Sequence, residues 1–438
     1  MDIKIKSFLV SPEHLDVAII IPTTPNRTDM VVRHIYALSK SALKPHILLV
    51  FASNDELDTL LKGVNNFLSN IRKTYNEISC IVLTPDYGCS FSAYVGMYYA
   101  YKLGFYIISI TDDDAIPLSE FFVKEIYNST RDNVIVQPKN FEYDQCMLTN
   151  HYKTVKRSCV KLAGYPDPSF FKNYDDIEYT IRLEKVIGKK FYCVQNAIYK
   201  HPPAKINCLQ IGDIFLSVRN VHIVLNRYPF YFAKRVLSGK AYAKSKKDYL
   251  CYLPIIVFLE MMPIFLSVLS MIVGLKELAI TFIRGLIFFM ISYKSPNKYL
   301  PRLSKTYYEL KAKYDKNLKV IGFEYTPSHQ DIIISSKTYL NMFTKKIKKL
   351  HYKNILLIDD EDFKIKKFVK SFMSVFRRIN KVMNENPNVK IVLFIPPNYP
   401  KGLLYILTVL AFVKLFIRSK LTALIMDPTE SKFIKFES

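Results

Sequence analysis

Short apolar runs rich in β-branched residues alternate with helix-length segments through the first 230 residues of the chain. The runs cover residues 17–21, 47–51, 80–83, 105–110, 133–136 and 191–194. Segments 29–39 and 90–103 between them are long enough for helices, and Gly104 ends the second. Strand, helix and strand at this spacing predict a parallel, doubly wound α/β sheet. Ligands of such sheets bind beyond the carboxyl ends of the strands, so the residues after each run are candidates for function.

Residues 231–299 differ in composition and are predicted to form a hydrophobic helical hairpin. Residues 250–274 are apolar apart from Glu260 and two serines, although two prolines interrupt them, and a second apolar stretch covers 278–293. Because basic residues flank both stretches, we expect a hairpin or an in-plane helix pair that associates with a membrane and keeps both ends on the cytoplasmic side. A buried pair of core helices is the alternative.

Residues 300–438 are predicted to form a second small α/β domain of unknown function. Strand-like runs cover 331–334, 354–358, 389–395 and 421–425, with helical segments at 339–350 and 403–416. We find no motif in this region. The predicted organisation is therefore a catalytic domain at 1–230, the hairpin at 231–299 and this domain at 300–438.

The chain is strongly basic, with 62 Lys and Arg against 38 Asp and Glu and a net charge of +24. Such a charge favours a polyanionic partner: nucleic acid, anionic lipid headgroups or a phosphate-bearing substrate. The first 16 residues lack the apolar core of a signal peptide, which predicts a cytoplasmic catalytic domain. The sequence does not predict an oligomeric state.

Three consecutive carboxylates, Asp112, Asp113 and Asp114, follow the apolar run 105–110 directly. Neighbouring carboxylates repel one another unless a cation or hydrogen-bond donors hold them. Asp112 and Asp114 can direct oxygens toward one point, which suits Mg²⁺ or Mn²⁺. A solvated acidic loop or a helix N-cap is the alternative for this motif taken alone.

Other polar residues follow further runs. The first strand ends in Pro22-Thr23-Thr24-Pro25-Asn26-Arg27, which is rich in donors but also reads as an ordinary loop that caps the next helix. Asp175 and Asp176 open a predicted helix, where the helix dipole favours carboxylates and where one of them can accept a proton from a hydroxyl. His201 follows the run 191–194, and a lone histidine is more often structural than a ligand.

In this order and spacing, about the first 225 residues resemble the inverting family 2 glycosyltransferases with the GT-A fold. IIIPTTPNR (19–27) is similar to that family's nucleotide loop, and TDDDAIP (111–117) is similar to its DxD metal motif. Asp175-Asp176 with IEYTIRL and Gly188 is similar to its ED or DD motif. Val218-Arg219-Asn220 resembles an element of the rhamnosyl- and galactofuranosyltransferase branch. The run after the second strand departs from the family pattern, since it supplies only Asp55.

The resemblance implies a role for each motif. Asp112 and Asp114 would bind Mn²⁺ or Mg²⁺ with the donor diphosphate, and His201 would complete the metal site. Asp176 would be the general base, with Asp175 beside it orienting the acceptor. The residues expected at the nucleotide are Thr23, Asn26, Arg27, Asp55, Gly88 and Asp113.

Together these features predict a membrane-associated, metal-dependent inverting glycosyltransferase. Its donor would be a nucleotide-sugar carrying UDP, dTDP or GDP, and its acceptor a lipid-linked or glycan molecule at the membrane surface. No nucleic-acid partner is expected, because intact carboxylates repel a polyanion. Two alternatives remain open: a non-catalytic, basic GT-A-like binding protein at the membrane, and a nucleotidyltransferase that consumes a nucleoside triphosphate.

Overall fold

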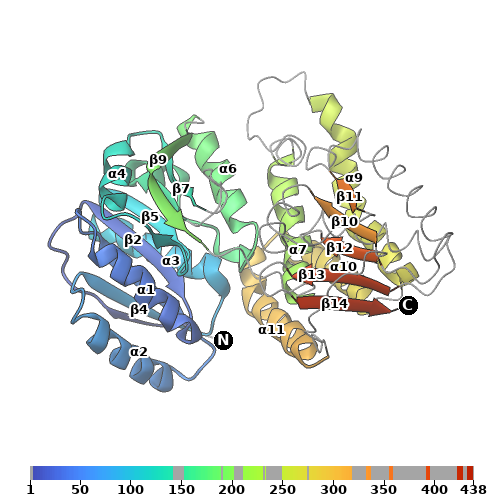
Figure 1. The fold of residues 1–438 in the computed structure, drawn as a ribbon, viewed down its shortest axis with the longest axis horizontal. Helices are drawn as coiled ribbons and strands as arrows, with labels where there is room; N and C mark the ends of the chain where they lie inside the picture. The colour runs from blue at the N-terminus through green and yellow to red at the C-terminus, as the bar shows by residue number, and fades with distance from the viewer. Residues whose placement is uncertain are drawn as a thin grey trace. The chain divides into compact units, whose positions relative to one another are not determined.

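The structure is a computed structural model. In it the chain forms two compact units. It describes residues 3–141, 152–188, 191–201, 211–229, 232, 249–273 and 276–317, and the five strands of a C-terminal sheet. The first unit contains residues 1–203 and 292–306, and the second contains 204–291 and 307–438. Figure 1 labels the elements of both units.

A nine-stranded mixed sheet forms the centre of the first unit. Its order is β1 (Lys4–Phe8), β4 (Ile78–Thr84), β3 (His46–Ala52), β2 (Val17–Thr23), β5 (Ile107–Thr111), β8 (Tyr152–Lys156), β7 (Ile135–Asn140), β9 (Phe191–Lys200) and β6 (Ile116–Pro117). The six predicted runs are all strands, so the α/β class is confirmed. The predicted strands β2, β3, β4 and β5 pair in parallel as expected, whereas β1, β8 and β6 make the sheet mixed because each pairs antiparallel with a neighbour.

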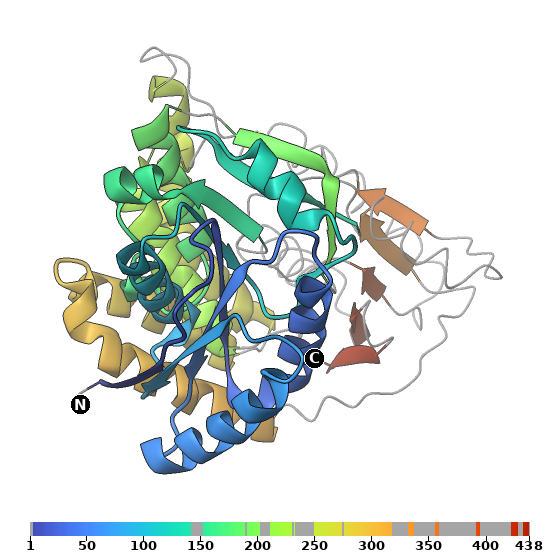
Figure 2. The same ribbon diagram turned by 90° about the vertical axis from the view of Figure 1, so that its left-hand side faces the viewer.

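Helices cover both faces of this sheet (Figure 2). Val17, Ile19 and Ile21 of β2 face the core shared with α1 (Thr28–Ser39), α2 (Leu57–Ile71) and α4 (Phe122–Ser129). Ala18 and Ile20 face the opposite core, shared with α3 (Gly88–Leu103), α5 (Arg157–Ala163) and α6 (Asp175–Ile187). Because successive strand residues point to opposite faces, a strand covered on both sides is apolar throughout.

The second unit contains α7 (Ile211–Arg227), α9 (Tyr249–Val273) and α10 (Lys276–Ser292) apart from its last residue. The two predicted hairpin segments are therefore helices. The Nδ1 and Nε2 atoms of His222 in α7 lie within hydrogen-bonding distance of two carbonyl oxygens, that of Val218 at 2.7 Å and that of Glu260 in α9 at 3.2 Å. Within the described residues, no helix has both the length and the apolarity that a bilayer crossing requires.

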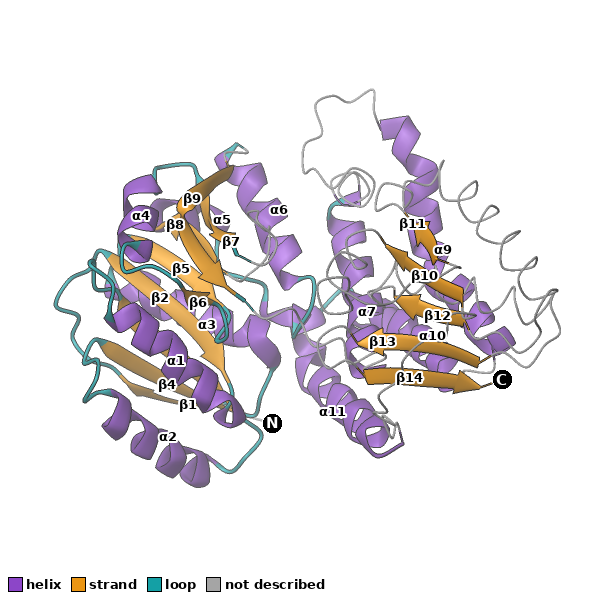
Figure 3. Ribbon diagram, viewed as in Figure 1, coloured by secondary structure: helices purple, strands orange, loops and turns teal. Residues whose placement is uncertain are grey.

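A five-stranded sheet completes the second unit (Figure 3). Its order is β11 (Ile355–Ile358), β10 (Ile332–Ser336), β12 (Ile391–Phe394), β13 (Thr422–Asp427) and β14 (Lys432–Glu437). The four predicted runs of this region are confirmed as strands, and the antiparallel edge strand β14 was not predicted. The predicted helical segments 339–350 and 403–416 lie outside the described residues. Helix α11 (Leu300–Asn317) is divided between the units at residue 307.

Candidate metal and transfer site

The acidic loop lies where β5 ends, at the carboxyl edge of the parallel strands. The Ala115 amide donates to the Asp112 carbonyl at 3.2 Å, which turns the chain tightly between β5 and the short strand β6. Asp113 is buried, while Asp112 and Asp114 keep partial access to solvent. The turn therefore directs the Asp113 carboxylate into the protein and the Asp112 and Asp114 carboxylates toward partly solvent-accessible positions.

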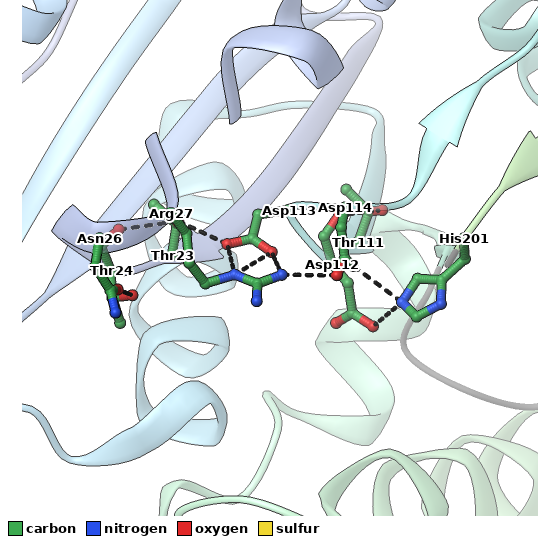
Figure 4. A network of polar contacts seen from close by, with 9 residues as sticks. All are labelled: Thr23, Thr24, Asn26, Arg27, Thr111, Asp112, Asp113, Asp114 and His201. Carbon is green, nitrogen blue, oxygen red and sulfur yellow. Dashed lines mark hydrogen bonds and ion pairs between the residues drawn. The ribbon is translucent and has the colours of Figure 1, made fainter. Parts of the chain in front are cut away.

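Asp112, Asp114 and His201 meet at one point (Figure 4). The His201 Nε2 atom lies 3.0 Å from Asp114 Oδ1 and 3.5 Å from Asp112 Oδ2. One ligand atom from each residue lies within 4.8 Å of the others. Strand pairing causes this convergence, because Ile116 of β6 pairs with Lys200 of β9 and so brings His201, the next residue, beside the acidic loop.

This donor set fits a divalent ion. Two carboxylates and one imidazole are ligands that Mn²⁺ accepts, and the carboxylates also suit Mg²⁺. Burial opposes a charge on His201, but hydrogen bonds with Asp112 and Asp114 and their charges raise its pKa to about 9. Burial likewise opposes ionisation of Asp114, yet His201 and Arg27 hold its pKa well below the usual range. The cluster therefore attracts positive charge, as a metal site must.

Arg27 and Thr23 hold the middle carboxylate, Asp113. The Arg27 Nε atom donates to both Asp113 oxygens at 2.9 and 2.8 Å, and its Nη2 atom bridges Asp113 Oδ1 at 2.6 Å and Asp114 Oδ2 at 2.7 Å. The Thr23 hydroxyl donates to Asp113 Oδ2 at 2.7 Å. Burial raises the pKa of Asp113, while the bonds from Arg27 and Thr23 lower it. These three residues were predicted at the nucleotide, and in the structure they also fix the metal-binding loop.

The remaining predicted nucleotide residues lie in separate loops. Asn26 pairs with the Thr24 hydroxyl in the short helix that follows β2. The Asp55 carboxylate accepts a hydrogen bond from the Ser53 hydroxyl at 2.6 Å, within its own loop after β3. Contact of Asn26 and Asp55 with a nucleotide stays a prediction.

Gly88 begins α3 at a place where no other residue fits. Its φ of +85° is in the left-handed region, and a Cβ atom there would lie 2.1 Å from the Phe171 carbonyl oxygen. That oxygen also accepts a hydrogen bond from the Ser90 amide at 3.1 Å. The predicted site residue Gly88 therefore allows the loop that leads to Asp175 and Asp176 to pack against the start of α3.

Asp175 and Asp176 form the first turn of α6, as predicted. Phe171, Asn173 and Tyr174 just before them all have positive φ angles between 63° and 65°, which is rare outside glycine and marks a strained segment. The Asp176 Oδ1 atom accepts a hydrogen bond from the Ile177 amide at 2.8 Å. Burial, followed by the charge of Asp176, raises the pKa of Asp175 to about 7.

Lys153 contacts the segment that carries these carboxylates, and no sequence pattern pointed to it. The buried Lys153 ammonium donates to the Asp176 carbonyl at 2.8 Å, and its charge lowers the pKa of Asp175. Lys153 lies in β8, a strand that the sequence did not reveal.

The fold and site define a mixed α/β protein with a candidate metal centre at the carboxyl edge of its larger sheet. No protein-family model matches the chain, and no curated protein matches its sequence. Among solved structures, S. aureus TarS 1-349 is similar with 14% identity and a TM-score of 0.35, over 71% of this chain and 94% of that chain.

Two further solved structures are similar to parts of the chain. The mannosyltransferase PcManGT from Pyrobaculum calidifontis, in complex with GDP-Man and Mn²⁺, has 12% identity and a TM-score of 0.38, over 69% of this chain and 87% of that chain. The catalytic domain of Drosophila β1,4-galactosyltransferase 7 has 13% identity and a TM-score of 0.30, over 41% and 65%. At these low TM-scores, none of the three structures indicates the function of this chain.

Proposed function

We propose that the protein is a metal-dependent inverting glycosyltransferase that uses a nucleotide-sugar donor carrying UDP, dTDP or GDP. The observation that carries this proposal is the meeting of Asp112, Asp114 and His201 where β5 and β9 end. The resemblance of the sequence motifs to family 2 glycosyltransferases with the GT-A fold supports it. Asp175 and Asp176 supply separate carboxylates, one of which can accept the proton of an acceptor hydroxyl.

The two carboxylate groups have different tasks in this reaction. Mg²⁺ or Mn²⁺ held by Asp112, Asp114 and His201 would neutralise charge on the leaving diphosphate. The Asp176 carboxylate accepts the proton of the acceptor hydroxyl, whose oxygen attacks the anomeric carbon from the face opposite the leaving group. This displacement inverts the anomeric centre.

Asp175 and the arginine clamp set the conditions for this chemistry. Asp175 holds a proton for part of the time at neutral pH, so the Asp175–Asp176 pair carries less than two negative charges. Arg27 keeps the acidic loop in place through Asp113 and Asp114. Its side chain is 42% exposed, so it can also contact a phosphate of the donor.

We further propose a lipid-linked or glycan acceptor at a membrane surface, with the catalytic unit in the cytoplasm. The supporting observations are the net charge of +24 and the apolar, basic-flanked segments between 231 and 299. The charge would bring the protein to anionic lipid headgroups.

Hydrolysis and transfer of a panel of nucleotide-sugars, titrated with Mn²⁺ and Mg²⁺, tests the chemistry. Asp114→Asn removes a charged ligand and should reduce activity at least 100-fold. The exposed Asp58→Asn, which makes the same chemical change, should leave activity unchanged. Full activity in excess chelator refutes the metal role, and release of pyrophosphate from a nucleoside triphosphate identifies a nucleotidyltransferase instead.

A further inference from the structure

Helix α9 exposes a row of large apolar side chains. The α9 apolar face consists of Val257, Met261, Ile264, Phe265, Val268 and Met271, each between 40% and 54% exposed. Their spacing of three and four residues places them along one side of the helix. The row from Val257 to Met271 extends about 21 Å at 1.5 Å per residue.

The other side of α9 is packed within its own unit. Leu259, Met262, Leu266 and Leu269 are buried. Polar contacts also fix the helix, because His222 of α7 lies 3.7 Å from the Glu260 carboxylate and the Ser267 hydroxyl donates to the Ala279 carbonyl of α10 at 3.1 Å. The helix is therefore held in one orientation, with its apolar face turned outward.

An exposed apolar row of this size needs an explanation. Single exposed apolar residues are normal on soluble proteins, but a contiguous row marks an interaction surface. Helix α10, the next helix along the chain, also exposes Ile287 and Met290, by 47% and 61%. A surface of this kind favours a partner with apolar chemistry.

Charge selects the kind of partner. Lys246 and Lys247 precede α9 in the chain, and Tyr293 and Lys294 follow α10 directly. Lysine and tyrosine residues that flank apolar helices in the sequence are typical of segments at the boundary between lipid headgroups and acyl chains. The net charge of +24 adds attraction to an anionic leaflet.

We propose that the α9 apolar face inserts into the surface of an anionic bilayer leaflet, with the helix lying in the membrane plane. A spanning orientation would place the His222–Glu260 contact in hydrocarbon, whereas an in-plane orientation keeps it on the protein side. The docking itself does not depend on the proposed chemistry. Only its use, which is to hold the site near a lipid-linked acceptor, rests on the proposed function.

A single tryptophan can report the insertion, because the chain contains none. Phe265→Trp in the full-length protein is mixed with vesicles of phosphatidylcholine, with and without phosphatidylglycerol. We expect a blue shift of its emission that is stronger with phosphatidylglycerol, and quenching by lipids brominated near the headgroup. Tyr192→Trp, at a 52% exposed position of β9, should show neither. Quenching only by lipids brominated near the bilayer centre contradicts the in-plane orientation.

A second comparison measures the contribution of the face. The triple variant Met261→Ser, Phe265→Ser, Val268→Ser should lower vesicle partitioning about 100-fold, because each half-exposed side chain contributes about fivefold. The matched control replaces the exposed Leu162, Val186 and Tyr192 with serine and should partition like the wild type.

Three outcomes overturn the proposal. The first is that the triple variant and the wild type partition equally into vesicles. The second is that high salt removes the wild type from vesicles completely. The third is that the wild type does not bind vesicles but forms a dimer, which the triple substitution converts to a monomer. Asp114→Asn should bind vesicles normally. Failure of the proposed chemistry is thus distinguishable from failure of the docking.

Discussion

Replacing Asp175 with asparagine should stabilise the protein at alkaline pH and leave it nearly unchanged in acid. The folded state holds the pKa of Asp175 at about 7, against 3.8 for an unperturbed carboxyl, because of burial and the charge of Asp176. Between these pH values the folded state binds a proton that the unfolded state has lost. The contribution of Asp175 to the free energy of unfolding is therefore fully present below about pH 4 and is lost as the pH rises to about 7.

The size of the effect follows from the same two pKa values. Each pH unit between them corresponds to 1.36 kcal/mol, so the cost of ionising Asp175 in the folded protein is roughly 4 kcal/mol. Asp175→Asn has nearly the same shape and carries no charge. We expect it to raise the free energy of unfolding by up to this amount at pH 8.

Denaturant unfolding of wild type and Asp175→Asn between pH 4 and pH 9 checks this prediction. The informative quantity is the difference between the two proteins, since other carboxylates also change stability in acid. The exposed Glu120→Gln controls for the loss of one negative charge and should show a small difference at every pH. A difference between wild type and Asp175→Asn that does not change with pH would refute the raised pKa.

The other site residues give three further predictions. Asp176→Asn should leave the fold and donor affinity intact and lower turnover by roughly 10² or more, measured by single-turnover transfer; unchanged turnover with lost donor binding would contradict its role as the base. Gly88→Ala should lower the free energy of unfolding by roughly 2–5 kcal/mol, because Gly88 has a positive φ and a Cβ atom there would collide with Phe171. Gly188→Ala is the control and should lower it by only about 1–2 kcal/mol, because Gly188 also has a positive φ (+75°) but no atom lies within 4 Å of its Cβ position. Arg27→Gln should loosen the acidic loop and weaken Mn²⁺ binding measured by calorimetry, and equal Mn²⁺ affinity of the two proteins would show that the clamp is unnecessary.

The strands that pass through the centre of the sheets were predictable because both of their faces are buried. The run 47–51 is apolar at every position for this reason, and β3 extends it by only one residue at each end. Strand β8 was not predictable, because Lys153 and Lys156 interrupt its apolar pattern. Lys153 is nonetheless buried, since the Asp176 carbonyl accepts a hydrogen bond from its ammonium group and its charge interacts with Asp175. The partner that allows Lys153 to be buried is 23 residues away in the sequence, so the local pattern does not indicate a strand here.

The same reasoning separates the predictable from the unpredictable part of the site. Asp112 and Asp114 are recognisable because three adjacent carboxylates after a strand need a cation or a donor, and chain position alone reveals this. The role of Asp113 depends on Arg27, which is 86 residues away, so no local pattern could show that the middle carboxylate anchors the loop.

The backbone conformation before α6 also depends on a residue that is distant in the sequence, Gly88. The three positive φ angles before α6 belong to residues that seldom adopt them, and the sequence there gives no sign of a turn that needs glycine. The glycine that permits this arrangement lies on another element, where its missing Cβ lets the Phe171 carbonyl approach the start of α3. The strain before Asp175 is therefore sustained by packing against Gly88 and by the Ser90 amide, and the positions of both proposed transfer carboxylates depend on a contact that only the folded chain contains.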